Sequence, residues 1–296
     1  MTLVRWFLLF AVWPTLVAVL HAEDPKSVLV FPGANKRETY FTIHNLRAAQ
    51  GLSTGRGIKV GILDHSFGTT LHPKLYAEGR NFVKGDEASL SEHEWHGYWM
   101  AAVLREIAPE AEIYALNIIV FDDPAATMDA MSRAIDWAVE RRIDVLTYSQ
   151  EAVKGEPRTV LDRALDRAHK AGIVTTFIHC SEPGNILPSG LWSGTDDGRE
   201  PDVNVLHYDY SVVFIDEYRK AVAGEKTWYQ PFLSVSSTSP VVGGVVALMK
   251  GLKPDLTPAQ CKAILRETAR PLEFEGETAP RTLDAGAAVS RVKALR

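Results

Sequence analysis

Four short runs of apolar residues recur along the first two thirds of the chain. Each has the length of a strand and is largely apolar at consecutive rather than alternate positions. The runs are IKVGIL at 58–63, EIYALNIIV at 112–120, IDVLTY at 143–148 and IVTTFI at 173–178. Strands of this kind are buried on both faces, which is typical of a parallel sheet covered by helices.

Between these runs, apolar residues recur at helical spacing. One set includes Met128, Met131 and Ile135, and a second includes Leu161 and Leu165. Strands that alternate with helices predict an α/β fold, doubly wound, with a mostly parallel central sheet flanked by helices. No Gly/Ser-rich linker or change of composition divides the pattern, so we expect one domain over 38–296.

The stretch from 182 to 234 breaks this alternation. It is rich in proline, glycine and aspartate, which favour turns and interrupt strands and helices. We expect long loops here with a strand or two, one of them at 211–215. The serine-rich turn that follows leads into an apolar helix, in which Pro240 suits the first turn and the pair Gly243–Gly244 permits close packing.

The first 22 residues form a separate segment. Arg5 is its only charged residue, the stretch 6–20 is apolar apart from Pro14 and Thr15, and Ala22 ends it. This pattern is typical of a secretory signal, and the stretch is shorter than the ~20 residues of a membrane-spanning helix. We predict a signal peptide at 1–22, a short extension at 23–37, and a secreted or periplasmic protein with no membrane span after cleavage. An uncleaved anchor is the alternative.

Composition narrows the class of protein. With 46% apolar and 23% charged residues and no low-complexity run, the chain is globular, and its net charge of −5 argues against a nucleic-acid binder. Two cysteines, Cys180 and Cys261, do not make a disulfide framework, and we expect two partly buried thiols. The oligomeric state is not determined by these features.

Three polar residues stand where buried elements begin or end. Asp64 follows the first apolar run, His96 precedes the apolar stretch GYWMAAVL, and Ser236 lies in SVSSTSPVVGGVVALM at 234–249. In open parallel sheets, functional residues gather at the carboxyl ends of the strands. A serine hydroxyl needs a base to take its proton, and that base needs a carboxylate to orient it. The set is therefore a candidate for nucleophilic catalysis.

A metal site is a second interpretation of the run from Glu92 to His96. The helix of a zinc protease carries H-E-x-x-H, with its histidines four apart, whereas His93 and His96 are three apart. EF-hand spacing is also missing from the acidic residues near 200, and we expect these to be solvated: Asp196, Asp197 and Asp202. We predict no metal and no cofactor, with calcium left open because no site for it is recognisable.

Three blocks of the chain resemble the subtilases, the family of subtilisin-like serine peptidases. GIKVGILDHSFG resembles the strand that ends in the catalytic aspartate, HGYWMAAVL the start of the histidine helix, and SVSSTSPVVGGVVALM the nucleophile helix. The resemblance implies a subtilisin-like fold and catalytic roles for Asp64, His96 and Ser236, in the chain order of subtilisin. Ser237 is a competitor for the nucleophile, but the spacing to Pro240 disfavours it.

The chain departs from the family pattern at several positions. Serine or threonine usually follows the catalytic aspartate, and here it is His65. In the family, an asparagine side chain donates a hydrogen bond to the oxyanion. Ser181 stands in that place, with Asn185 as a rival if the loop is rearranged. The substrate-pairing segment, Ser-Leu-Gly in the family, is Ser149, Gln150 and Glu151 here, so it differs at two of its three positions, and we assign a substrate-binding role to all three.

A serine in place of the family's oxyanion asparagine should lower the turnover rate. A hydroxyl is a shorter and less directed donor than an amide, and loss of the amide costs ~10²–10³-fold in subtilisin. We therefore expect a slow or specialised serine endopeptidase that cleaves peptide or protein substrates through an acyl-enzyme on Ser236. Glu151 or Glu182 would favour basic substrate side chains. The alternative is a pseudopeptidase that keeps the fold and binds a peptide or protein partner without cutting it, and a non-peptide ester or amide hydrolase is a third interpretation.

Overall fold

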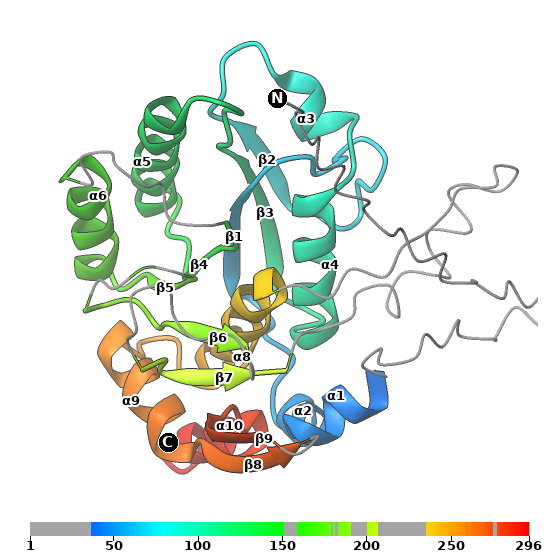
Figure 1. Cartoon of the computed structure of the whole chain (residues 1–296), viewed down its shortest axis with the longest axis vertical. Coiled ribbons are helices and arrows are strands. Elements are labelled where there is room, and N and C mark those ends of the chain that lie inside the picture. Colours follow the sequence, from blue (N-terminus) through cyan, green and yellow to red (C-terminus); the bar gives the residue numbers. More distant parts are fainter. Residues whose placement is uncertain are drawn as a thin grey trace, which may run out of the picture.

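The centre of the molecule is a five-stranded parallel sheet, in the order β2-β3-β1-β4-β5 (Figure 1). The computed structural model describes residues 37–150, 159–178, 180, 183–190, 200–206, 235–274 and 277–295. The strands of this sheet are β1 (Lys59–Asp64), β2 (Glu78–Asn81), β3 (Glu112–Asn117), β4 (Val145–Tyr148) and β5 (Val174–Phe177). Because β1 is central and the chain proceeds outward on both sides of it, the predicted doubly wound parallel sheet is confirmed.

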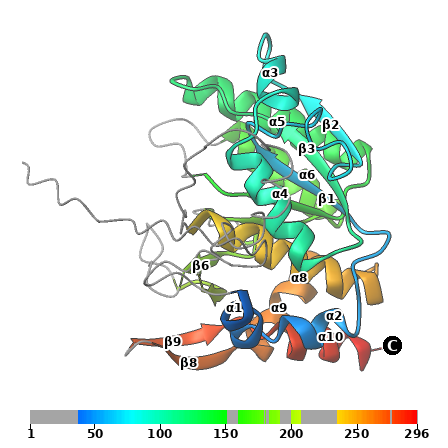
Figure 2. The same cartoon turned by 90° about the vertical axis from the view of Figure 1, so that its right-hand side faces the viewer.

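Helices cover both faces of this sheet (Figures 1 and 2). On one face lie α5 (Pro124–Glu140) and α6 (Thr159–Lys170), and on the other lie α4 (His96–Ile107) and α8 (Thr238–Leu252). Successive residues of β1 supply both cores, since Ile62 packs in the cluster with α4 and α8 and Leu63 in the cluster with α5 and α6. The strands are therefore apolar at consecutive positions, as a sheet buried on both faces requires.

A second, four-stranded sheet lies beside the first, with the order β6-β7-β9-β8 (Figure 1). Its strands are β6 (Pro188–Gly190), β7 (Val203–Val205), β8 (Arg270–Phe274) and β9 (Glu277–Thr282). The remaining elements are short or peripheral helices: α1 (Arg37–Ile43), α2 (Leu46–Gln50), α3 (Glu87–Ser91), the 3-10 turn η1 (Val235–Ser237), α9 (Pro258–Thr268) and α10 (Ala285–Lys293). The sequence pattern predicts no strand at β2, β8 or β9.

Helix α8 is the central helix of the molecule. Its residues from Thr238 to Lys250 are all buried. A Cβ at Gly243 would lie 2.5 Å from Thr147 of β4, and one at Gly244 would lie 2.7 Å from Ile107 of α4, so the predicted close packing of this glycine pair is confirmed. The stretch Val235–Leu252 is long and apolar enough to cross a membrane, but 83% of it is buried inside the protein, as expected of a core helix.

One loop prediction is wrong. Asp202 is only 3% exposed, and it accepts hydrogen bonds from the Leu187 backbone at 2.8 Å and from Arg266 at 2.7 Å. Lys262 forms an ion pair with it at 3.0 Å. A buried carboxylate needs such partners, so this residue holds β6 and α9 together instead of lying in a solvated loop.

Several other sequence predictions can be placed. Both cysteines are free thiols, and they are more deeply buried than the partly buried thiols that the sequence predicts. The predicted signal at 1–22, nearly all of the extension at 23–37, the strand at 211–215, and Asp196 and Asp197 lie outside the described residues.

Candidate active site

The carboxylate of Asp64 lies at the carboxyl end of the central strand β1 and is fully buried. Its Oδ1 accepts a hydrogen bond from the backbone N–H of His65 at 2.8 Å. The Nδ1 of His96 lies 2.9 Å from Oδ1 and 2.8 Å from Oδ2. A carboxylate that accepts from Nδ1 fixes the imidazole ring and leaves its Nε2 as the nitrogen that can act as a base.

His96 is the first residue of α4, as the sequence predicted. The start of this helix is tied to the loop after β1, because the backbone N–H groups of Trp95 and Gly97 donate to the carbonyls of Ser66 and His65 at 2.7 and 2.8 Å. A Cβ at Gly97 would lie 2.4 Å from the His65 carbonyl oxygen. The absence of a side chain at Gly97 therefore sets how closely His96 approaches Asp64.

The environment of His96 acts on its pKa in two directions. Burial lowers the pKa of the imidazole, but the charge of Asp64 and its hydrogen bond raise it, and together they outweigh burial, so the pKa lies above its ordinary value. The imidazole of His96 therefore holds a proton more readily than an ordinary histidine does.

Ser236 lies in the turn η1, which leads directly into α8 and contacts α4. Its side chain is buried, and its Oγ donates a hydrogen bond to the backbone carbonyl of Ser149 at 3.1 Å. The neighbouring Ser237 is fully buried. Ser239 anchors the start of α8 on the sheet, since its Oγ accepts from the Tyr148 N–H at 3.1 Å and donates to the Thr176 carbonyl.

The segment after β4 reaches the Asp64–His96 pair. Ser149 contributes its carbonyl to Ser236, and the Nε2 of Gln150 donates to Asp64 Oδ1 at 3.3 Å and lies 3.3 Å from His96 Nδ1. The sequence assigns Gln150 to substrate binding, and in the structure its side chain contacts Asp64 and His96. The signal that could have indicated this is position, because Gln150 follows β4 at the same sheet edge as Asp64.

The structure restricts the candidates for the oxyanion donor. Ser181, and Glu151 of the substrate-binding segment, lie outside the described residues. The rival Asn185 is buried, and its amide is fully used: Nδ2 donates to the carbonyls of Phe177 and Cys180, and Oδ1 accepts from the Phe177 N–H, each at 2.9 Å. Asn185 therefore closes the loop after β5 and has no donor left for an oxyanion.

His65 follows Asp64 directly, and the sequence assigns it no role in catalysis. Its ring is stacked on that of His96 with centroids 5.8 Å apart and an interplanar angle of 12°. The exposed ring of Phe121 packs edge-on against it at 4.9 Å. Burial lowers the pKa of His65, Asp64 opposes this, and His96 lowers it further. The charged form of the His65 imidazole is thus disfavoured beside His96.

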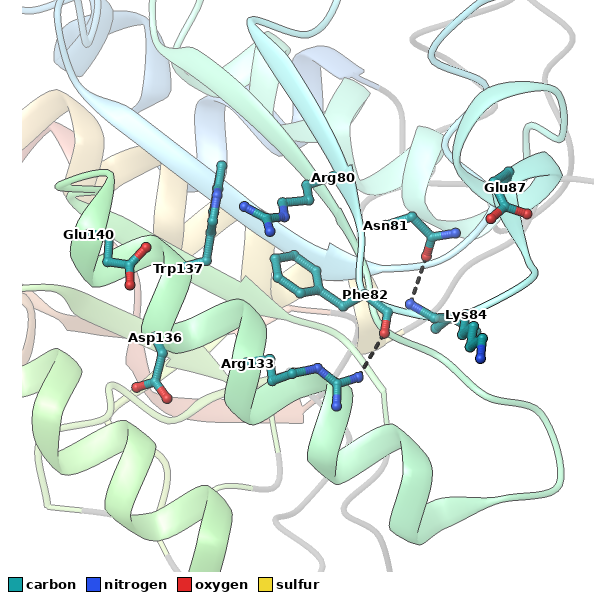
Figure 3. Close-up of a pocket in the computed structure, with 10 residues that line it drawn as sticks. Arg80, Asn81, Phe82, Lys84, Glu87, Arg133, Asp136, Trp137 and Glu140 are labelled. Carbon is teal, nitrogen blue, oxygen red and sulfur yellow. Dashed lines mark hydrogen bonds between the residues drawn. The ribbon is translucent and has the colours of Figure 1, made fainter.

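A groove elsewhere on the molecule carries a different set of side chains. Residues of β2, the segment after it and α5 line this volume of about 470 Å³ (Figure 3). Arg80 lies over the rings of Phe82 and Trp137, at 5.3 and 5.7 Å from their centroids. The lining cations are matched by Glu87, Asp136 and Glu140. Because no predicted catalytic residue lines this groove, we place the candidate active site at Asp64 and His96.

The chain is similar to known serine peptidases in both sequence and fold. The model of the subtilase family matches residues 55–192, a range that includes Asp64 and His96 and ends before Ser236. The thermostable alkaline protease of Halalkalibacterium halodurans is 26% identical over 236 residues, which is 73% of this chain and 63% of that protein. Subtilisin DY of Bacillus licheniformis is 26% identical over 252 residues, covering 75% of this chain and 86% of that protein.

Among solved structures, the MycP3 protease from the type VII (ESX-3) secretion system has the same fold. The two share a TM-score of 0.67 at 17% sequence identity, over 88% of this chain and 90% of that one. At this identity the likeness concerns the fold alone.

Proposed function

As this chain is a divergent member of the subtilase family, we propose that it is a serine endopeptidase that forms an acyl-enzyme on Ser236. The observation that carries the proposal is the hydrogen-bonded pair of Asp64 and His96 at the carboxyl edge of the sheet. Its second support is the contact of α4 with η1, the turn that contains Ser236.

In the proposed reaction, the Oγ of Ser236 attacks the carbonyl carbon of the scissile peptide bond. His96 takes the hydroxyl proton on Nε2 and returns it to the leaving amine, while Asp64 accepts from Nδ1–H and stabilises the imidazolium. Water then hydrolyses the ester by the same route in reverse. The Ser236 hydroxyl donates to the Ser149 carbonyl in the structure, so it must turn from this carbonyl to His96 for the first step.

The negative oxygen of the tetrahedral intermediate needs hydrogen-bond donors. The backbone N–H of Ser236 and the N-terminal end of α8 supply part of the positive potential. We propose Ser181 as a partial side-chain donor. Ser181→Asn should raise kcat, because an amide reaches further than a hydroxyl, and steady-state kinetics on a peptide substrate measure this. Unchanged or lower kcat in a folded variant would refute the role of Ser181.

The test of the main proposal is labelling with a fluorophosphonate probe. An activated serine displaces fluoride and forms an Oγ–P bond, which requires the general base but no particular peptide sequence. We expect labelling of the purified chain, loss of labelling in Ser236→Ala, and retention in Ser237→Ala. Circular dichroism should show that all three chains are folded.

The same experiment separates the peptidase from the pseudopeptidase. The substitutions at Ser181, Gln150 and Glu151 favour the second candidate, a chain that binds a peptide or protein partner without cutting it. A folded wild-type chain that does not label would support binding alone. Labelling lost only in Ser237→Ala would instead show that the nucleophile is one residue later.

Substrate preference and location are further proposals. Glu151 and Glu182 carry the charge that would favour Lys or Arg side chains, and a peptide library profile without enrichment of basic residues would exclude this preference.

We propose export through residues 1–22. N-terminal sequencing of chain recovered from the extracytoplasmic fraction should begin after Ala22, whereas an intact N-terminus in the membrane fraction would indicate an anchor.

A further inference from the structure

Asp64, His65 and His96 form a cluster of three metal-ligating side chains. One ligand atom from each lies within 4.8 Å of the other two. The Nε2 of His65 is 3.9 Å from Asp64 Oδ1, too far for a hydrogen bond. Its other ring nitrogen, Nδ1, is occupied by the hydroxyl of Ser66 at 2.8 Å. The nitrogen that faces the carboxylate is therefore the one with capacity for a ligand.

The spacing of these atoms suits a transition metal ion. Zn²⁺ binds imidazole nitrogen and carboxylate oxygen at ~2.0–2.2 Å, so two ligand atoms of one ion can be no more than about 4.2 Å apart. The 3.9 Å between His65 Nε2 and Asp64 Oδ1 lies within this reach. His96 already touches the same carboxylate, and a small rotation of its ring would bring a nitrogen to the same ion.

A small part of each histidine side chain reaches the surface, whereas the carboxylate does not. The side chains of His65 and His96 are 10% and 13% exposed, and that of Asp64 is fully buried. An ion would thus enter past the two imidazole rings and reach the carboxylate last. The desolvated carboxylate supplies charge, and the two imidazoles are nitrogen ligands of the kind that Zn²⁺ and Cu²⁺ prefer.

We propose that Asp64, His65 and His96 bind a divalent transition metal ion such as Zn²⁺, and that this ion reversibly inhibits the enzyme. Asp64 would supply a carboxylate oxygen, His65 its Nε2, and His96 its Nδ1, whose proton is released to solvent, with water as the fourth ligand. The Nδ1 of His96 cannot bind the ion and donate to Asp64 at once. The inhibitory part rests on the proposed function, while the binding part does not.

Binding is measured first, on the full Ser236→Ala chain stripped with EDTA. Zn²⁺ alone is titrated against a chromophoric chelator, with wild-type residues at the three ligand positions. We expect one ion per chain at micromolar or lower concentration. His65→Ser, which restores a residue usual for the family, should weaken this by at least about tenfold, since loss of even an outer-shell contact has such an effect. His93→Asn is the matched control, because His93 is exposed in the same region.

Inhibition is measured next, on chains with Ser236 in place. Zn²⁺ should block fluorophosphonate labelling, and EDTA should restore it, with each variant compared to its own metal-free rate. The site would be supported if Zn²⁺ no longer blocks labelling of His65→Ser but still blocks labelling of His93→Asn. Equal sensitivity in both variants, or no stoichiometric Zn²⁺ on the folded Ser236→Ala chain, would overturn it. A chain that binds Zn²⁺ but never labels would refute the peptidase and leave the metal site standing.

Discussion

At the scale of single residues, the Asp64 carboxylate is the centre of the site. Three donors converge on its Oδ1: the His65 N–H, His96 Nδ1 and Gln150 Nε2, at 2.8, 2.9 and 3.3 Å. Hydrogen bonds to a buried charge are worth ~1.5–3 kcal/mol each, so each donor competes with the others for the same charge. The proton affinity of His96 therefore depends on the two other donors to Asp64, the His65 N–H and Gln150.

Gln150 should act on the pH dependence of catalysis. Its amide withdraws charge from Asp64 and lies 3.3 Å from His96 Nδ1, and both effects disfavour the imidazolium. Gln150→Met keeps the length but removes the donor. Asp64 already raises the pKa of His96. In the Met variant the apparent pKa of the acid limb of kcat/KM should rise further, by about half a pH unit. The shift is small because the pKa reports only the difference between the interactions of the charged and the neutral imidazole with the amide.

A second variant makes the sign of this effect testable. Gln150→Glu places a negative charge beside the imidazolium and should raise the apparent pKa further, so the expected order is wild type, Met, Glu. The measurement is kcat/KM for a peptide ester between pH 5 and 9. An acid limb that does not move in the Met variant would show that Gln150 does not contact the pair during catalysis.

At the scale of elements, small residues set the distances between α4, α8 and the sheet. Gly97, Gly243 and Gly244 each stand where a Cβ would lie less than 3 Å from a neighbouring atom. Alanine is favoured over glycine inside helices by about 1 kcal/mol. The close approach outweighs this preference here, because real Cβ atoms essentially never lie so near another atom.

Gly97→Ala should move the start of α4. The new methyl would lie 2.4 Å from the backbone carbonyl of His65, which cannot rotate away as a side chain can. We expect a loss of about 1–3 kcal/mol in unfolding free energy and a fall in kcat of up to about 10²-fold, the effect of a 1 Å misplacement. Urea unfolding and steady-state kinetics measure the two.

Gly51→Ala is the control for this change. Gly51 follows α2 with helical dihedral angles, and the nearest atoms to its Cβ would be at 3.5 Å, an ordinary contact. Its stability and kcat should remain near those of the wild type. If Gly97→Ala also retained wild-type kcat, the spacing between the loop after β1 and α4 would not control His96.

At the scale of the whole molecule, His44 joins three distant segments. It is fully buried after α1, its Nδ1 donates to the Leu283 carbonyl at 2.9 Å, and its Nε2 accepts from the Leu206 N–H at 3.0 Å. Arg270 extends the junction by donating to the carbonyl of Ile43 at 2.7 Å. The neutral imidazole thus connects the N-terminal helices to the residues that follow β7 and β9 of the second sheet.

This junction should make the fold sensitive to acid. Burial lowers the pKa of His44 to about 4 from its usual 6.5, although the bond to Leu283 opposes this. The unfolded chain therefore binds the proton first. Stability is unaffected above pH 6.5 and falls as pH drops from 6.5 towards 4, by about 3 kcal/mol in total.

Urea midpoints at pH 7, 5.5 and 4.5 measure this loss. His44→Asn should be less stable than the wild type at pH 7, because one bond is lost, but should lose less stability on acidification. Parallel pH profiles for the two chains would assign the acid sensitivity to other groups.

The strands β1, β3, β4 and β5 and the closeness of Asp64 to His96 were predictable from the sequence because their signals are local. Strands buried on both faces are largely apolar at consecutive positions, and a polar residue at the end of such a strand is visible beside it. The strands β2, β8 and β9 were not predictable in this way. The strand β2 is Glu-Gly-Arg-Asn, and β8 and β9 each contain a proline, so only pairing with neighbouring strands makes them strands.

The sequence by itself determined the doubly wound sheet, the place of His96 at the start of its helix, and the resemblance to the subtilases. Only the tertiary structure decided that Gln150 and His65 contact Asp64 and His96, that the amide of Asn185 is fully hydrogen-bonded within its own loop, and that Asp202 is buried. The physical reason is range. Burial on both faces and helical spacing can be recognised from residues close together in the sequence. A hydrogen bond between residues 86 apart, as from Gln150 to Asp64, forms only when the strands that carry them are aligned.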